Sequence, residues 1–92
     1  MPSDLPTIAE IRENIDEADE IILRALAARM KCAKHLKILK DQMGLKIADP
    51  KREEALKAQW KKRAAELGFA PELALMILDF ILSESRRIQE AS

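Results

Sequence analysis

Residues 7–42, "TIAEIRENIDEADEIILRALAARMKCAKHLKILKDQ", decide the fold, because no glycine or proline interrupts them. Their apolar residues advance in steps of three and four along the first half, and the same phase resumes after Arg29. Thr7, with Glu10 three residues later, is the pattern of a capping box at a helix start. The stretch therefore predicts one long helix over about residues 7–42.

The length of this helix indicates a second copy of the chain. At 1.5 Å per residue it forms a rod of about 50 Å. A compact domain of this size has a radius of gyration of about 13 Å, so the rod is longer than such a domain is wide. The rest of the chain could cover the rod only if its helices lay end to end along it. A homodimer is the simplest arrangement that covers it.

Two breaks divide the remaining sequence. Gly44 and the pair Asp49-Pro50 bracket the first break, and Gly68 and Pro71 bracket the second. Asp49 is a good N-cap and Pro50 a good first helical residue. The sequence thus predicts an all-α fold in a single domain, residues 1–92, with one long and two shorter helices at about 7–42, 50–67 and 71–90, and a disordered tail over residues 1–6.

The two shorter helices each carry an apolar line that should face inward. In the second helix this line is Leu56, Trp60, Ala64 and Leu67. In the third helix it is Leu73, Ile77, Phe80, Ile81 and Ile88.

Composition excludes several classes of function. Lys and Arg number 16 and Asp and Glu number 16, so the formal net charge is zero and there is no basic excess for nucleic acid. No apolar run approaches the roughly 20 residues that span a bilayer. Cys32 is the single cysteine, which fits a reducing compartment. No zinc-ligand spacing or phosphate loop is present. We expect a cytoplasmic protein without a metal site that binds neither nucleic acid nor membranes.

Polar side chains recur on the inward faces of all three predicted helices. They are Arg29 and Lys40 on the first, Glu53 with Arg52 beside it on the second, and Ser85 and Gln89 on the third. Unpaired buried charge is costly, so two cations on one inward face call for an anion. Arg29 and Lys40 are within about 20° of one helix face and about 16 Å apart, so both can reach one small ligand.

Arg12 lies about 25 Å further along the rod, so it would serve a pocket completed by a second subunit. A plain helical interaction module is the alternative at this point, because a coiled coil tolerates an occasional cation and a single Arg usually reaches water. The recurrence of polar groups on every helix favours the anion site.

One known family has similar residues in the same order. The chain resembles the AroQ-type, all-α chorismate mutases, whose first helix has an Arg, then Ile-Asp-x-x-Asp, then a Leu-rich turn and a second Arg. Here these are Arg12, Ile15-Asp16, Asp19 and Arg29. The resemblance continues through Lys40, "DPKREE" (residues 49–54) and "ILSESRRIQ" (residues 81–89), and covers about residues 8–89.

The resemblance implies an intertwined helical homodimer of the chorismate mutase II type. It also implies the Claisen rearrangement of chorismate to prephenate, the branch step toward phenylalanine and tyrosine, with no cofactor and no metal. The substrate is a small dicarboxylate with a hydroxyl and an ether bridge, which matches the anion that the inward cations require. Donors aimed at the ether oxygen would stabilise the charge that grows there in the transition state.

The resemblance also implies how the substrate is anchored. Arg29 and Arg12 would bind its carboxylates, with Arg12 supplied by the partner subunit. Ser85 would help to hold a carboxylate, and Arg52 would close the pocket.

The remaining roles concern the ring and the reacting bond. Asp49 and Glu53 would receive the ring hydroxyl. Lys40 and Gln89 would donate hydrogen bonds to the ether oxygen. The residues expected to be catalytic are therefore Lys40, Gln89 and Arg29.

Other readings stay open on the same fold. An isochorismate-pyruvate lyase shares the Arg, Lys and Gln positions, although Asp49, Arg52, Glu53 and Ser85 match the mutase pattern better. A mutase of the 4-amino analogue of chorismate and a non-catalytic helical dimer are further options. We expect a monofunctional enzyme without feedback control by phenylalanine or tyrosine.

Overall fold

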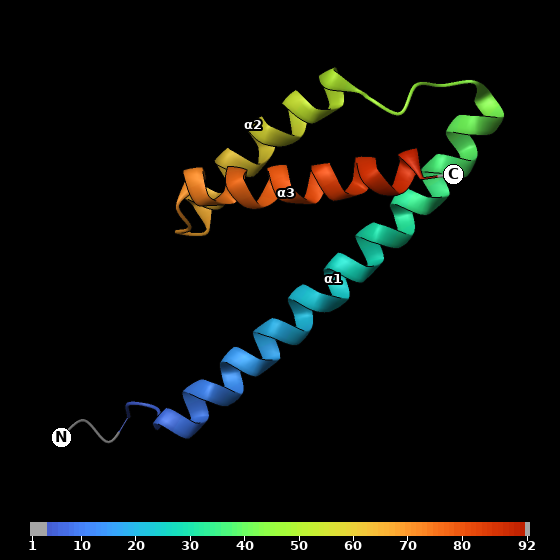
Figure 1. The fold of residues 1–92 in the computed structure, drawn as a ribbon. Coiled ribbons are helices and arrows are strands. Elements are labelled where there is room, and N and C mark those ends of the chain that lie inside the picture. Colours follow the sequence, from blue (N-terminus) through green and yellow to red (C-terminus); the bar gives the residue numbers. More distant parts are fainter. Residues whose placement is uncertain (1–3, 92) are drawn as a thin grey trace.

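The structure, a computed structural model, describes residues 4–91 and consists of three helices. They are α1 (Ile8–Met43), α2 (Pro50–Glu66) and α3 (Pro71–Glu90), shown in Figure 1. The predicted all-α fold is confirmed, and each helix begins and ends within about one residue of the predicted position, which is the usual uncertainty of helix bounds. Of the tail predicted over residues 1–6, residues 1–3 lie outside the described residues, and residues 4–6 precede α1 without forming a helix.

The expected capping residues start two of the helices. The Thr7 hydroxyl accepts a hydrogen bond from the Glu10 backbone N–H at 3.1 Å. The Asp49 carboxylate accepts one from the Arg52 backbone N–H at 3.2 Å, with Pro50 as the first helical residue. Gly44 ends α1 with a φ of 67°, a left-handed conformation that favours glycine. These local signals explain why the helix bounds could be predicted.

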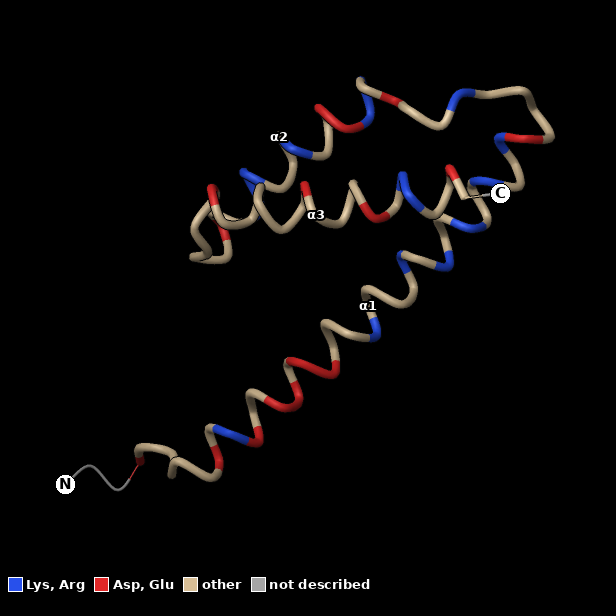
Figure 2. The backbone as a smooth tube through the Cα atoms, viewed as in Figure 1, with Lys and Arg blue, Asp and Glu red and all other residues tan. Residues whose placement is uncertain are grey.

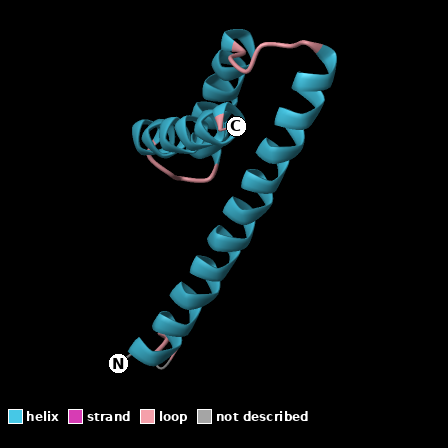
Figure 3. Ribbon diagram, turned by 45° about the vertical axis from the view of Figure 1, so that its right-hand side comes forward, coloured by secondary structure: helices cyan, strands magenta, loops and turns pink. Residues whose placement is uncertain are grey.

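α3 packs against both other helices and carries most of the core. Leu56 of α2 contacts Leu78 and Leu82 of α3, and the half-buried Trp60 packs against this cluster. Ala33, in the C-terminal half of α1, is the buried residue of that helix. Figures 1 and 3 show α2 and α3 as a helical hairpin beside the C-terminal half of α1. The core is therefore confined to one end of the molecule.

The N-terminal half of α1 projects away from this hairpin (Figures 1 and 3). The chain measures 64 × 24 × 15 Å and has a radius of gyration of 17.7 Å, well above the ~13 Å of a compact domain of this size. The apolar residues along the projecting half stay exposed, with Ile8 at 69% and Ile15 at 53%. A single chain thus leaves the apolar face of its longest helix uncovered.

Only part of the predicted inward face of α3 is buried within one chain. Ile81 is buried, but Leu73, Ile77 and Phe80 are exposed, Phe80 at 77%. α3 carries large apolar residues on two faces, and the chain covers only the face that faces α1 and α2. The predicted inward face of α2 agrees better with the observed burial. Leu56 and Ala64 are buried and Trp60 is half-buried, whereas Leu67, just after the helix end, is exposed.

Among residues 4–91, none of the helices combines the length and the apolar character that crossing a membrane requires.

Candidate active site

A cavity of about 150 Å³ lies where the C-terminal half of α1, the start of α2 and the end of α3 meet. Its polar lining combines side chains from all three helices. Those that carry charge or a polar side chain are Arg29, Lys40, Asp49, Arg52, Glu53, Ser85, Arg86 and Gln89. Its apolar lining is Leu36, Ile47, Leu56 and Leu82. The cavity is thus a polar pocket set against the end of the hydrophobic core.

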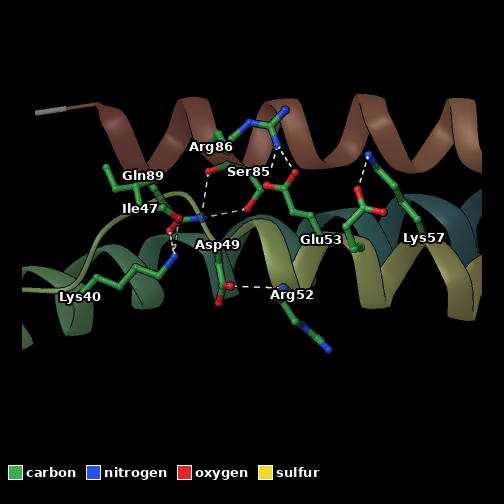
Figure 4. A network of polar contacts seen from close by, with 10 residues as sticks. Lys40, Ile47, Asp49, Arg52, Glu53, Lys57, Ser85, Arg86 and Gln89 are labelled. Carbon is green, nitrogen blue, oxygen red and sulfur yellow. Dashed lines mark hydrogen bonds and ion pairs between the residues drawn. The ribbon is translucent and has the colours of Figure 1, made fainter.

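Lys40 is the centre of a hydrogen-bond network that joins the first and third helices (Figure 4). Its ammonium donates to the Ile47 carbonyl and to the Gln89 side-chain oxygen, both at 2.8 Å. Gln89 is buried, and its amide nitrogen donates to the Ser85 hydroxyl at 3.2 Å and to the Ser85 carbonyl at 3.3 Å. Because these partners are fixed by helix and loop backbone, the ammonium is held at one place in the pocket.

A second contact crosses from α2 to α3. Arg86 donates through Nη1 to both carboxylate oxygens of Glu53, at 2.7 Å each, as Figure 4 shows. The two side chains are partly buried, 38% exposed for Arg86 and 24% for Glu53. This ion pair fixes the Glu53 carboxylate at the wall of the cavity and cancels its charge.

The neighbouring Arg87 makes a different kind of pair. It donates to Glu84, one turn earlier on the same helix, and its Nε lies 2.9 Å from a Glu84 carboxylate oxygen. This hydrogen bond and the positive charge of Arg87 lower the pKa of Glu84. Arg87 is exposed and does not line the cavity, so this pair belongs to the outer surface of α3.

The lining side chains have an excess of positive charge. Four cations, Arg29, Lys40, Arg52 and Arg86, stand against two carboxylates, Asp49 and Glu53. Figure 2 shows the same concentration of basic residues where the C-terminal half of α1 meets the end of α3, although the whole chain is neutral. Within the described part of the chain, neither the Arg29 nor the Arg52 guanidinium has an ion-pair partner closer than 4.0 Å. The pocket therefore suits a small anion with more than one negative charge.

Seven of the eight residues predicted for the site line this one cavity. They are Arg29, Lys40, Asp49, Arg52, Glu53, Ser85 and Gln89. Arg12 does not line it. Arg12 is exposed on the projecting half of α1, about 25 Å along the helix from Arg29.

Sequence reasoning missed Arg86 and the carbonyl of Ile47. Arg86 follows Leu78 and Leu82 at four-residue steps, so it continues the row of α3 that forms the core. The row through Leu78, Leu82 and Arg86 was not predicted to face inward, because the neighbouring row through Ile77 and Ile81 was chosen instead. The Ile47 carbonyl lies in the loop between α1 and α2 and has no side-chain signal.

Across residues 4–91, no group of three or more His, Cys, Asp or Glu side chains is arranged to hold a metal ion. The polar groups that the cavity offers to a ligand are mainly hydrogen-bond donors. Ammonium, guanidinium, amide and hydroxyl groups converge on a small space beside apolar walls, where electrostatic interactions are stronger than in water. The fold and the pocket together define an all-α protein with a cavity whose lining carries more cations than carboxylates.

Comparison with known proteins identifies the family. The model of the family "Chorismate mutase type II" matches residues 11–90, and the chain belongs to this family. The chain is 31% identical to the chorismate mutase of Methanocaldococcus jannaschii over 83 residues, which are 90% of this chain and 84% of that protein. It is 32% identical to the T-protein of Enterobacter agglomerans over 78 residues, which are 85% of this chain and 21% of that protein. No solved structure matched the chain.

Proposed function

We propose that the protein is a chorismate mutase that converts chorismate to prephenate in the cavity between α1, α2 and α3. The observation that carries the proposal is the position of Lys40, whose ammonium is held by Ile47 and Gln89 inside a cavity with more cations than carboxylates. The rearrangement is intramolecular, so the protein has to hold one conformer and stabilise the charge that develops on it.

The charges of the pocket fit the substrate. Arg29 binds one carboxylate of the dianion, because a guanidinium can grip a carboxylate through two parallel hydrogen bonds. Ser85 helps to hold a carboxylate, and Arg52 closes the pocket near the loop that precedes α2. Asp49 and Glu53, at the first turn of α2, receive the ring hydroxyl.

Lys40 and Gln89 act on the reacting bond. Negative charge grows on the ether oxygen as its bond to the ring breaks, and donors already aimed at that atom bind the transition state more strongly than the ground state. The Lys40 ammonium has three N–H donors, and two are used by Ile47 and Gln89. The third is available for the ether oxygen. Gln89 has two amide protons, and both are directed at Ser85 in this structure. With substrate bound, one of them would turn from Ser85 to the same ether oxygen.

The complete site also requires a second copy of the chain. We propose a homodimer in which the projecting half of α1 lies against the partner and supplies Arg12 to the partner's cavity. Two features support it: the exposed apolar face of α1, and an apolar groove of about 490 Å³ beside Arg29. The groove is lined by residues that a monomer would leave in water, among them Ile22, Ile77 and Phe80. We further propose a cytoplasmic location, because the lone Cys32 fits a reducing compartment.

The test is to supply purified protein with chorismate and isochorismate separately and to identify the products. Prephenate from chorismate supports the proposal. Salicylate and pyruvate from isochorismate, without prephenate, would instead identify an isochorismate-pyruvate lyase on the same fold. No turnover of either substrate would favour a non-catalytic helical dimer.

A further inference from the structure

Arg86 lines the cavity but has no role in the mechanism above. It reaches from α3 to Glu53 on α2, and a single guanidinium nitrogen lies 2.7 Å from both carboxylate oxygens. The pair joins residues 33 positions apart in the chain, so it depends on the tertiary fold and is not a local helix pair. Glu53 is therefore the charged group through which Arg86 can influence the site.

Glu53 poses an electrostatic problem for a site that binds a dianion. Its carboxylate is needed as an acceptor for a hydroxyl, yet its charge repels the two carboxylates of the substrate. In the low effective dielectric of a partly closed pocket, a nearby like charge opposes binding more strongly than it would in water. A cation in contact with Glu53 removes most of this repulsion and leaves lone pairs of the carboxylate free to accept from the hydroxyl.

We propose that Arg86 is a positioning residue for this reaction: it fixes the orientation of the Glu53 carboxylate toward the substrate hydroxyl and neutralises its charge against the substrate dianion. This inference rests on the proposed chorismate mutase activity. It assigns to Arg86 no contact with the reacting atoms.

The kinetic consequence follows from the part of the substrate that Glu53 faces. The ring hydroxyl keeps its charge during the rearrangement, so Glu53 and Arg86 act on substrate and transition state alike. Loss of such uniform binding raises KM and leaves kcat nearly unchanged. We expect Arg86→Gln to raise KM for chorismate about tenfold, because the pair is partly exposed and solvent screens the uncovered charge.

The decisive experiment measures KM and kcat for Arg86→Gln in two backgrounds, with Glu53 intact and with Glu53→Gln. The Glu53→Gln background has no carboxylate to orient, so there we expect Arg86→Gln to raise KM by clearly less than tenfold, because only the attraction between the Arg86 charge and the dianion is lost. Arg86→Lys, which restores the positive charge, should recover most of the lost affinity. Arg87→Gln removes an arginine of the outer surface one position away, and we expect it to leave both constants unchanged.

Three outcomes would overturn the inference. An equal KM penalty in both backgrounds would mean that Arg86 acts on the substrate by its own charge or by direct contact and does not position Glu53. Unchanged KM, with a fall only in the urea midpoint of unfolding, would mean that the pair serves the fold alone. A wild-type protein that does not turn over chorismate would overturn the proposed function and this inference with it, whereas the first two outcomes leave the proposed function standing.

Discussion

Lys40 is a long, flexible side chain that the fold converts into a fixed donor. Its two oxygen partners come from a loop carbonyl and from a buried side chain on another helix, each 2.8 Å away. Ordering a lysine costs up to about 2 kcal/mol of side-chain entropy, and in this structure that cost is met during folding. The ammonium is therefore oriented before any ligand binds, which is the condition that the proposed electrostatic catalysis requires.

Lys40→Ala should lower kcat about 10²–10³-fold, because removing one preorganised donor costs about 3–4 kcal/mol of transition-state stabilisation. Helical content measured by circular dichroism should stay at the wild-type value, since the caps and the core cluster are untouched. Lys34→Ala, an exposed lysine of the same helix, is the control and should be fully active. A kcat of Lys40→Ala close to the wild-type value would contradict the proposed role of Lys40 as a donor to the ether oxygen.

Arg29→Lys tests a different property, the shape of the cation. The charge is kept, but a lysine ammonium cannot make two parallel hydrogen bonds to one carboxylate. The loss of one charged hydrogen bond, about 1.5–3 kcal/mol, should reduce kcat/KM for chorismate about 10- to 100-fold. Arg24→Lys is the matched control, because Arg24 lies on the exposed half of α1 and pairs with Glu20. Equal kcat/KM for Arg29→Lys and wild type would show that only the charge matters.

At the scale of elements, Asp49 at the start of α2 both caps the helix, through its carboxylate, and lines the cavity. The cap orients the first turn, and that turn presents Glu53 to the cavity. Helix stability and site geometry are therefore linked at this terminus.

Asp49→Ala should lower the free energy of unfolding by about 1 kcal/mol, the usual cost of losing an N-cap. Asp49→Asn should lower it by only a few tenths, because Asn caps helices about as well as Asp. Urea unfolding at one fixed protein concentration measures both, since dimer dissociation would make stability depend on concentration. A loss of equal size in the two variants would contradict the capping role.

The bounds of the three helices could be predicted from the sequence better than their packed faces. The helix bounds were predictable because Thr7, Gly44 and the pair Asp49-Pro50 act on their own neighbours. Lys40 and Gln89 were found because each is a polar interruption in an apolar helical row. The packed face of α3 was predicted only in part and Arg86 was not predicted, because large apolar residues occupy two faces of that helix and only a tertiary neighbour selects one.

At the scale of the whole molecule, one chain leaves two apolar faces uncovered. The projecting half of α1 exposes an isoleucine-rich stripe, and α3 exposes Ile77 and Phe80 beside the apolar groove. A two-fold symmetric pair can bury both faces at once, since each copy offers the same two surfaces to the other. In the homodimer proposed above, covering this stripe would place Arg12 of one chain near Arg29 of the other.

Mixing two inactive variants tests this shared site. Arg12→Ala and Arg29→Ala chains should each form dimers with two damaged sites. In a mixed dimer one site receives both mutations and the other receives neither, so unfolding and refolding an equal mixture should restore roughly a quarter of wild-type activity. Each variant refolded alone is the control. If Arg12 served the cavity of its own chain, every site in the mixture would still lack one arginine, and no activity would return.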